Sequence, residues 1–376
     1  MVQTRLRTPL EAEIIEKIRR SGPITYCEFI EACLYHPQHG YYMKQREDAA
    51  DFYTSAELHP IFGRLMARQL AEMWTILGSP DPFSIMEVGS GNGRLAEAIL
   101  AWLSRNRPEI YRVARYVSVE LSPAARAAQE KRLSDQIAAG RVLVERRMPA
   151  GPLVGCVLSN ELVDSFPVHV VVQEAGRMQE VFVSTQDGEL VETVSEPSNA
   201  ALVEHFSRFG VQLAEGQRAE ADLYASAWIA GVARRLERGF VLTIDYGYLA
   251  NQLFDERHFS GTFMAYRQHR AHGRLLESPG EQDLTHHVNF TALIEAGREN
   301  GLELTGLASQ MQFLMALGRG NEFADLYDEG QSETDRYRAR LQLKTLIYPE
   351  GMGETFRVLI QQKDVAPESV SGLVGI

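Results

Sequence analysis

The fold is constrained most by three glycines at alternate positions, Gly89, Gly91 and Gly93. They follow an apolar run at 84–88 that is typical of a buried strand, and they precede a helical pattern at 94–103. Glycines between a strand and a helix allow the backbone to approach a bound ligand where a Cβ atom would clash. The spacing therefore predicts a parallel sheet with a ligand-binding loop at the carboxyl end of its first strand.

The pattern after residue 82 supports this sheet. Short apolar runs alternate with helical segments, as expected for parallel strands joined by crossover helices. Residues 1–80 instead show helical patterns, with helix starts at Thr25 and Ser55, the latter continuing to Gly78. We predict a doubly wound, Rossmann-like α/β fold. Its strands are expected at 84–88, 116–119, 142–144, 154–158, 239–247 and, antiparallel, 355–361, with inserted antiparallel strands at 168–172, 181–183 and 189–194.

The chain of 376 residues is longer than a usual single domain of about 100 to 200 residues. We divide it where its pattern changes. The expected segments are an N-terminal helical segment at 1–80, the first half of a cofactor-binding core at 81–170, an inserted β/α subdomain on the substrate side at 171–235, and the second half of the core at 236–376 with a long loop insertion at 248–289. Loops of that length usually are functional or contain further structure.

The glycine loop differs from the dinucleotide-binding fingerprint, in which the third glycine stands one residue later and the loop holds a pyrophosphate. Glu87 directly before the loop suits the ammonium of S-adenosylmethionine (SAM) better than a phosphate. Glu120 ends the second strand, where a carboxylate can accept hydrogen bonds from both ribose hydroxyls. The alternative is a glycine-rich turn that only packs a strand on a helix. The expected cofactor-binding residues are Glu87, Gly89, Ser90, Gly91, Asn92, Gly93 and Glu120, with Thr54 and Ser55 covering the cofactor unless Ser55 merely caps a helix.

Further motifs, spread over nearly the whole chain, resemble the MidA family of class I SAM-dependent methyltransferases. These motifs are Leu34–Pro37 with Gly40–Tyr42, Asp51–Glu57, Glu87–Gly93, Ser118–Pro123 with Gln129, Ser159–Val168, Asp245–Gly247, Gly261–Thr262 with Tyr266 and His269, Pro279–Gly280, Asp283–Thr285, His287–Phe290, and Met352–Gly353 before Phe356–Leu359. The chain departs from the family pattern at four positions. The family usually has Pro at Ser90, Arg at Asn92, Asp at Ala98 and Ala at Ser159.

The resemblance implies an enzyme that uses SAM and releases S-adenosylhomocysteine. Mitochondrial relatives in this family are protein arginine methyltransferases that assist the assembly of respiratory complex I. The resemblance therefore implies a protein side chain, with arginine first, as the methyl acceptor. Two alternatives stay open: a small-molecule O- or N-methyltransferase, which would need a closed apolar pocket in place of an open acidic groove, and a SAM-binding assembly factor without catalysis.

Asn160, Glu161 and Asp164 follow the fourth strand at the open end of the sheet, where substrates of doubly wound folds bind. A guanidinium is protonated in water, so carboxylates must hold it and help it lose a proton before methyl transfer. We predict these three residues as catalytic, the alternative being a turn residue beside two solvated acids. Further candidates are the loop residues His269, His286 and His287 as bases and Asp245 and Tyr246 as cleft residues.

A net charge of −12 argues against a nucleic-acid partner, because phosphate recognition uses a basic face, and it suits a basic protein substrate. Cys27, Cys33 and Cys156 are too scattered for a disulfide framework or a zinc site, so no metal is expected. No apolar run reaches the roughly 18 residues of a membrane span. We expect a cytoplasmic protein without a membrane partner, and a homodimer is compatible with this sequence.

Overall fold

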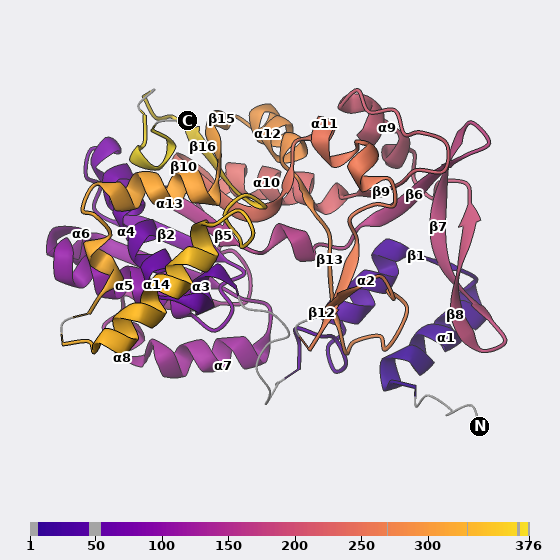
Figure 1. The fold of residues 1–376 in the computed structure, drawn as a ribbon, viewed down its shortest axis with the longest axis horizontal. Helices are drawn as coiled ribbons and strands as arrows, with labels where there is room; N and C mark the ends of the chain where they lie inside the picture. The colour runs from indigo at the N-terminus through magenta and orange to yellow at the C-terminus, as the bar shows by residue number, and fades with distance from the viewer. Residues whose placement is uncertain (1–6, 45–53, 269, 329, 367–368, 375–376) are drawn as a thin grey trace. The chain divides into compact units, whose positions relative to one another are not determined.

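A computed structural model describes residues 7–44, 54–268, 270–328, 330–366 and 369–374 (Figure 1). The chain forms two compact units, each assembled from three stretches of sequence. The Rossmann unit comprises residues 53–162, 229–247 and 294–376, and the insertion unit comprises 1–52, 163–228 and 248–293. The expected segments followed one another along the chain, whereas these two units are interleaved in sequence. Pairing between strands far apart in sequence causes the difference, because β1 (Ile24–Thr25) pairs with β7 (Arg177–Gln186).

One sheet with the strand order β15-β16-β10-β5-β2-β3-β4 forms the centre of the Rossmann unit. Neighbouring strands from β10 to β4 are parallel, whereas β16 is antiparallel to both β10 and β15. The bounds are β2 (Phe83–Val88), β3 (Ala114–Val119), β4 (Val142–Glu145), β5 (Leu153–Asn160), β10 (Leu236–Tyr248), β15 (Glu303–Ser309) and β16 (Phe356–Lys363). The predicted doubly wound, Rossmann-like class is confirmed. The sequence did not predict β15, which begins with two exposed residues and becomes buried only at its end.

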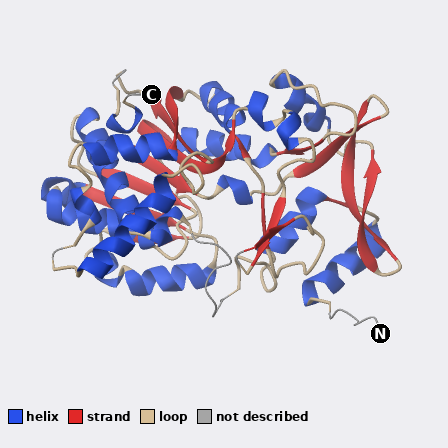
Figure 2. Cartoon of the chain, viewed as in Figure 1, coloured by secondary structure: helices blue, strands red, loops and turns tan. Residues whose placement is uncertain are grey.

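Helices lie on both sides of this sheet (Figure 2). Their bounds are α3 (Ser55–Leu58), α4 (Ile61–Ile76), α5 (Arg94–Asn106), α6 (Pro108–Val113), α7 (Pro123–Arg132), α8 (Ser134–Ala138), α13 (Gln310–Arg319), η3 (Ala324–Leu326), α14 (Glu333–Ile347) and η4 (Ser371–Leu373). Apolar residues of α4 and α5, such as Leu65 and Ile99, pack with Phe83 and Ile85 of β2 in one core. This packing fixes the start of β2 and leaves its carboxyl end for the glycine loop.

The single helix expected from Ser55 to Gly78 is interrupted. The structure has the short helix α3, then an extended His59 with φ −157° and ψ 143°, and then α4. Pro60 explains the break, because a residue that precedes proline is disfavoured in the helical conformation. The break separates the 54–58 segment from α4, so this segment can take its own position beside the glycine loop.

The insertion unit contains a sheet in the order β1-β7-β6-β9, with β8 paired to β7, and a small sheet β12-β11-β13. The strand bounds not yet given are β6 (His169–Glu174), β8 (Glu189–Ser195), β9 (Arg218–Ala221), β11 (Met264–Arg267), β12 (Arg270–His272), β13 (Asp283–Thr285) and β14 (Val288–Asn289). The helices are α1 (Pro9–Ser21), α2 (Tyr26–Tyr35), η1 (Val163–Ser165), α9 (Ala200–Arg208), α11 (Ala250–Leu253) and η2 (Glu256–His258), and α10 (Leu223–Arg235) and α12 (Phe290–Glu299) have residues in both units.

The capping box that was expected at Thr25 and Glu28 opens α2, as predicted. The long stretch 248–289 contains short helices and strands, which explains how it remains ordered without long apolar runs. Within the described part of the chain, each helix is too short or too polar to cross a membrane.

Candidate cofactor and catalytic site

The glycine loop lies at the carboxyl end of β2, and all three of its glycines have a left-handed backbone. Their φ values are 73° for Gly89, 52° for Gly91 and 80° for Gly93, a region that residues with a Cβ atom rarely adopt. A Cβ on Gly89 would lie 2.8 Å from Leu162 Cδ1, whereas a Cβ on Gly91 would have no heavy atom within 4 Å. Gly89 is therefore required for packing, and Gly91 leaves open space next to the loop backbone.

Buried polar side chains hold the loop from its protein side. Gln129 on α7 donates from Nε2 to Ser90 Oγ at 2.8 Å and to the Gly91 carbonyl at 2.6 Å, and its Oε1 lies 2.6 Å from Ser118 Oγ. Ser90 Oγ and Ser118 Oγ are 2.7 Å apart. The Ser90 side chain, expected to bind cofactor, is thus buried in the loop support. Its contribution to a ligand is limited to its backbone.

Glu120 stands at the end of β3, next to β2. Its Oε2 accepts a hydrogen bond from Gly91 N and its Oε1 one from Ser122 N, both at 2.8 Å. Burial raises the pKa of this carboxyl, and the backbone donors act in the opposite direction. The carboxylate is therefore fixed beside the open face of Gly91, as the expected ribose interaction requires.

Glu87 is placed differently from the sequence expectation. Its side chain is only 3% exposed, and Tyr116 donates its hydroxyl proton to Glu87 Oε2 at 2.6 Å. Burial raises the pKa of Glu87 to about 8. The carboxyl is therefore largely protonated at pH 7, faces Tyr116 on β3, and does not offer a negative charge to an ammonium.

The raised pKa makes the stability of the protein depend on pH. A carboxyl with a pKa near 8 when folded and near 4.5 when unfolded holds its proton more tightly in the folded state. Its contribution to the free energy of unfolding therefore falls as pH rises between these values, by up to roughly 1.4 kcal/mol per pH unit. We expect Glu87→Gln to remove this fall. Urea unfolding of both proteins from pH 5 to pH 9 measures the difference, and parallel curves would contradict the assignment.

The 54–58 segment links the glycine loop to the end of β5. Glu57 Oε1 accepts a hydrogen bond from Asn92 Nδ2 of the loop at 2.7 Å, and Ser55 N donates to Glu161 Oε1 at 2.8 Å. The Ser55 side chain is fully buried and lies 3.3 Å from Gln310 Oε1. The expected cofactor contact of the Ser55 hydroxyl is therefore not supported, whereas Thr54 is half-buried at the start of this segment.

Asn160 is the last residue of β5 and Glu161 follows it, with a φ of 52° that is unusual for a residue with a side chain. Two backbone donors on either side of its Cα hold this conformation. Glu161 N donates to the Ile244 carbonyl at 2.9 Å, and Leu162 N donates to Asp245 Oδ2 at 3.2 Å. Asp245, a cleft candidate by sequence, is fully buried and thus positions Glu161. Strained conformations of this kind are common at functional sites.

Asp164 belongs to the insertion unit, although it follows Glu161 by only three residues. It lies on η1 and is 5% exposed. The pKa values of Tyr42 and Tyr266 are both raised, first by burial and then by the nearby carboxylates of Asp164 and Asp283. Tyr42 also donates its hydroxyl proton to Asp283 Oδ1 at 2.8 Å. The insertion unit therefore gathers two acids and two tyrosines, of which sequence reasoning singled out only Asp164 as catalytic.

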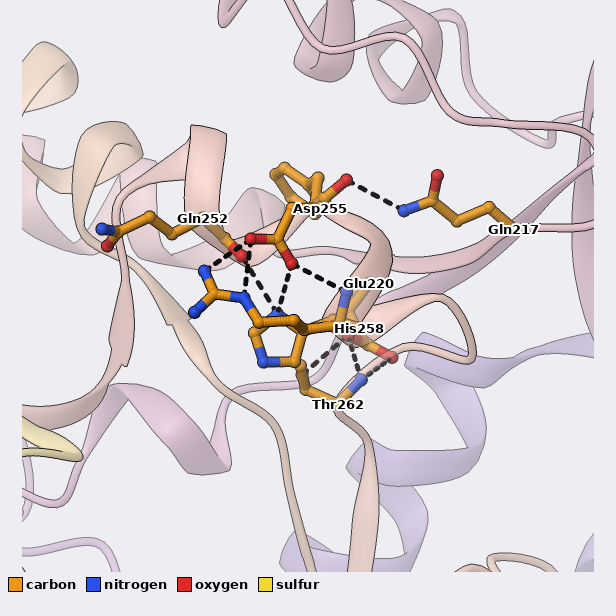
Figure 3. Close-up of polar contacts among 8 residues, drawn as sticks. Gln217, Glu220, Gln252, Asp255, His258 and Thr262 are labelled. Atoms are coloured by element: carbon orange, nitrogen blue, oxygen red, sulfur yellow. Dashed lines mark hydrogen bonds and ion pairs between the residues drawn. The ribbon is translucent and has the colours of Figure 1, made fainter.

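The expected loop bases are not suited to proton transfer near pH 7. Burial lowers the pKa of both His286 and His287 to about 4, so both rings are neutral there. His269 and residues 51–53 lie outside the described residues. The nearby Gly261-Thr262 motif has a structural partner: Glu220 accepts hydrogen bonds from Thr262 N and from Thr262 Oγ1, the latter at 2.8 Å (Figure 3). Glu220 also accepts a hydrogen bond from Phe263 N.

Known proteins resemble this chain over most of its length. A family model described as "Putative S-adenosyl-L-methionine-dependent methyltransferase" matches residues 65–308. The protein arginine methyltransferase NDUFAF7 homolog, mitochondrial, of Drosophila melanogaster is 29% identical over 93% of this chain and 84% of its own length. The human protein arginine methyltransferase NDUFAF7, mitochondrial, is 27% identical over 93% and 82%. A Burkholderia thailandensis protein, solved bound to S-adenosyl-homocysteine, has a TM-score of 0.87 and 29% identity, with 99% and 98% of the two chains covered.

These relatives overturn one expectation. The sequence suggested a cytoplasmic protein, but the curated relatives from fly, mouse and human are all named as mitochondrial, so that expectation is wrong. Its basis was too weak, because three free buried cysteines indicate a reducing environment and do not distinguish one compartment from another.

Proposed function

Because the chain belongs to the family of SAM-dependent methyltransferases whose model matches residues 65–308, we propose that it methylates a protein side chain, with arginine as the acceptor. The carboxylate of Glu161 carries this proposal, since Glu161 directly follows β5, the strand that pairs with β2, and Ser55 N holds its carboxylate there. The names of the relatives support the arginine assignment, because they are protein arginine methyltransferases.

Three observations indicate that residues of the Rossmann unit can bind the cofactor. Gly91 leaves open space where a Cβ would stand, Glu120 is held beside it, and Asn160 Oδ1 is buried without a hydrogen-bond partner among the described residues. When bound, SAM supplies an electrophilic methyl group on a sulfonium. We assign the loop backbone to its binding and Glu120 to its ribose hydroxyls, where a carboxylate accepts two hydrogen bonds.

Glu161 has two tasks in this proposal. Its carboxylate attracts the guanidinium, which is always protonated in water, and takes up the proton that the attacking nitrogen must lose. The hydrogen bonds from Ser55 N and Asn160 Nδ2 to Oε1 fix the direction of the carboxylate, so that it does not have to be ordered when substrate arrives. A fixed acceptor of this kind supports transfer to a cationic side chain rather than to an uncharged hydroxyl.

Asp164 of the insertion unit, 5% exposed, remains a proposed acid for the same acceptor, because carboxylates attract a guanidinium. The net charge of −12 further suggests that the methylated arginine lies in a basic protein segment. A homodimer is compatible with the sequence, and sedimentation velocity would measure whether it forms.

One experiment tests the proposed function. The protein is incubated with methyl-labelled SAM and a cell extract, and the labelled products are identified by mass spectrometry. We expect label on arginine side chains of protein. Label found only in the small-molecule fraction would indicate a small-molecule methyltransferase, and binding of SAM without transfer to any fraction would indicate a binding protein without catalysis.

A further inference from the structure

The side-chain oxygen of Asn160 is a hydrogen-bond acceptor with a fixed direction. Its side-chain amide donates from Nδ2 to Glu161 Oε1 at 3.0 Å. A carboxylate oxygen only accepts hydrogen bonds when ionised, so the NH₂ group must face it and the carbonyl must face away. The residue is 9% exposed, and Oδ1 is buried with no partner in the described part of the chain. Buried polar atoms of this kind are normally paired, so Oδ1 is prepared for a donor that a ligand brings.

The position of Asn160 in the sheet indicates which part of SAM it contacts. Ser159 of β5 pairs with Val88 of β2, so Asn160 is level with Gly89, the first residue of the glycine loop. Glu120 directly follows β3, which lies on the other side of β2. Neighbouring strands are about 4.8 Å apart, so the ends of β3 and β5 are separated by about 10 Å. If the ribose of SAM lies at Glu120, the rest of the molecule extends across the glycine loop. Its amino acid portion then lies near the end of β5.

The acids near the loop do not provide the partner that the ammonium of this portion needs. Glu87 is buried against Tyr116 with a pKa raised to about 8, so it carries little charge at pH 7. Glu120 lies at the opposite side of β2, where it is held by Gly91 N and Ser122 N and is assigned to the ribose hydroxyls. An ammonium has three donors and no acceptor, and it matches an amide oxygen that lacks a donor.

Resting on the proposed function, we infer that Asn160 is a cofactor-binding residue whose Oδ1 accepts a hydrogen bond from the ammonium of the SAM methionine portion. Glu161 then positions Asn160 by accepting its Nδ2, in addition to its role toward the substrate. This assignment moves Asn160 from the catalytic residues to the residues that recognise the cofactor. It also replaces Glu87, which the sequence suggested for the same ammonium.

Calorimetric titration with two ligands tests the inference without relying on turnover. S-adenosylhomocysteine carries the amino acid portion, whereas 5′-methylthioadenosine has the same nucleoside without the ammonium. We expect Asn160→Leu, which keeps the side-chain size, to weaken binding of S-adenosylhomocysteine about tenfold or more, the range for hydrogen bonds with a charged partner. Binding of 5′-methylthioadenosine should change less than about twofold, a difference too small to reflect a lost hydrogen bond.

Two further variants separate this role from a structural one. Asn160→Asp keeps an oxygen acceptor and should keep the preference for S-adenosylhomocysteine. Ser159→Ala removes the buried hydroxyl of the preceding residue and should leave both affinities unchanged. Equal losses for both ligands in Asn160→Leu, or no loss for either, would overturn the inference. If the wild-type protein bound neither ligand, the proposed function itself would fail. Unchanged ligand binding with impaired use of the acceptor would assign Asn160 to the substrate instead.

Discussion

Glu161→Gln is expected to lower turnover about a hundredfold or more while leaving SAM affinity nearly unchanged. The amide keeps the shape of the side chain, and its oxygen can still accept the hydrogen bond from Ser55 N. It loses the negative charge that attracts a guanidinium and the capacity to take up its proton. Because this interaction acts in the transition state, kcat and kcat/KM for the acceptor protein should fall together. Steady-state kinetics with a labelled acceptor and calorimetry with SAM measure the two effects separately.

A thermal unfolding control accompanies this variant. An unchanged Tm would show that the variant is folded as stably as the wild type, so that a loss of turnover does not result from unfolding. Full turnover with only a raised KM would show that Glu161 binds the acceptor and does not assist proton removal. Loss of SAM binding together with turnover would place the role of Glu161 in the cofactor site.

Gly91→Arg should abolish SAM binding, with a loss of affinity above about a hundredfold, while the protein still folds. A side chain at φ 52° costs only about 1 kcal/mol in backbone strain, and no protein atom lies within 4 Å of the added Cβ. The long side chain would instead occupy the open space that we assign to the cofactor. Calorimetry with S-adenosylhomocysteine measures the loss.

Gly140→Arg is the matched control for this variant. Gly140 has a φ of 66° and also has no heavy atom within 4 Å of an added Cβ. It lies just before β4, at the amino end of the sheet and away from the glycine loop. Both variants therefore carry similar strain and the same added charge. Equal affinity of the two variants for S-adenosylhomocysteine would remove Gly91 from the cofactor site.

Local patterns predicted the sheet and the loop because each signal lies within a few residues. The apolar run before Gly89 and the helical spacing after Gly93 both describe elements that form where the sequence placed them. The misplacement of Glu87 was avoidable from sequence. Side chains alternate along a strand, so Glu87 shares a sheet face with Phe83 and Ile85, which pack in one core with residues of α4 and α5. The break between α3 and α4 was likewise signalled by His59-Pro60.

Other parts of the site depend on contacts that sequence spacing does not encode. Gln129 supports the loop from a helix 38 residues beyond Gly91, and Tyr42 meets Asp283 across 241 residues. The low pKa values of the loop histidines follow from their burial, which a loop composition does not suggest. The grouping of residues 1–52 with 163–228 is of the same kind, since it results from the pairing of β1 with β7.

The interleaving of the two units has a consequence for how the protein is made. Synthesis produces α1 and α2 first, but β7, the partner of the adjoining strand β1, follows only after four strands of the Rossmann sheet, β2 to β5, have been made. Domains usually fold as they emerge from the ribosome, and distant pairings must wait. In a nascent chain released at residue 162, the apolar residues of α1 and α2 would be exposed, because the strands β6 and β7 that pack against them would be missing. The apolar residues of α1 and α2 therefore stay exposed until β6 and β7 have been synthesised, and chaperones that bind apolar segments would protect them during that interval.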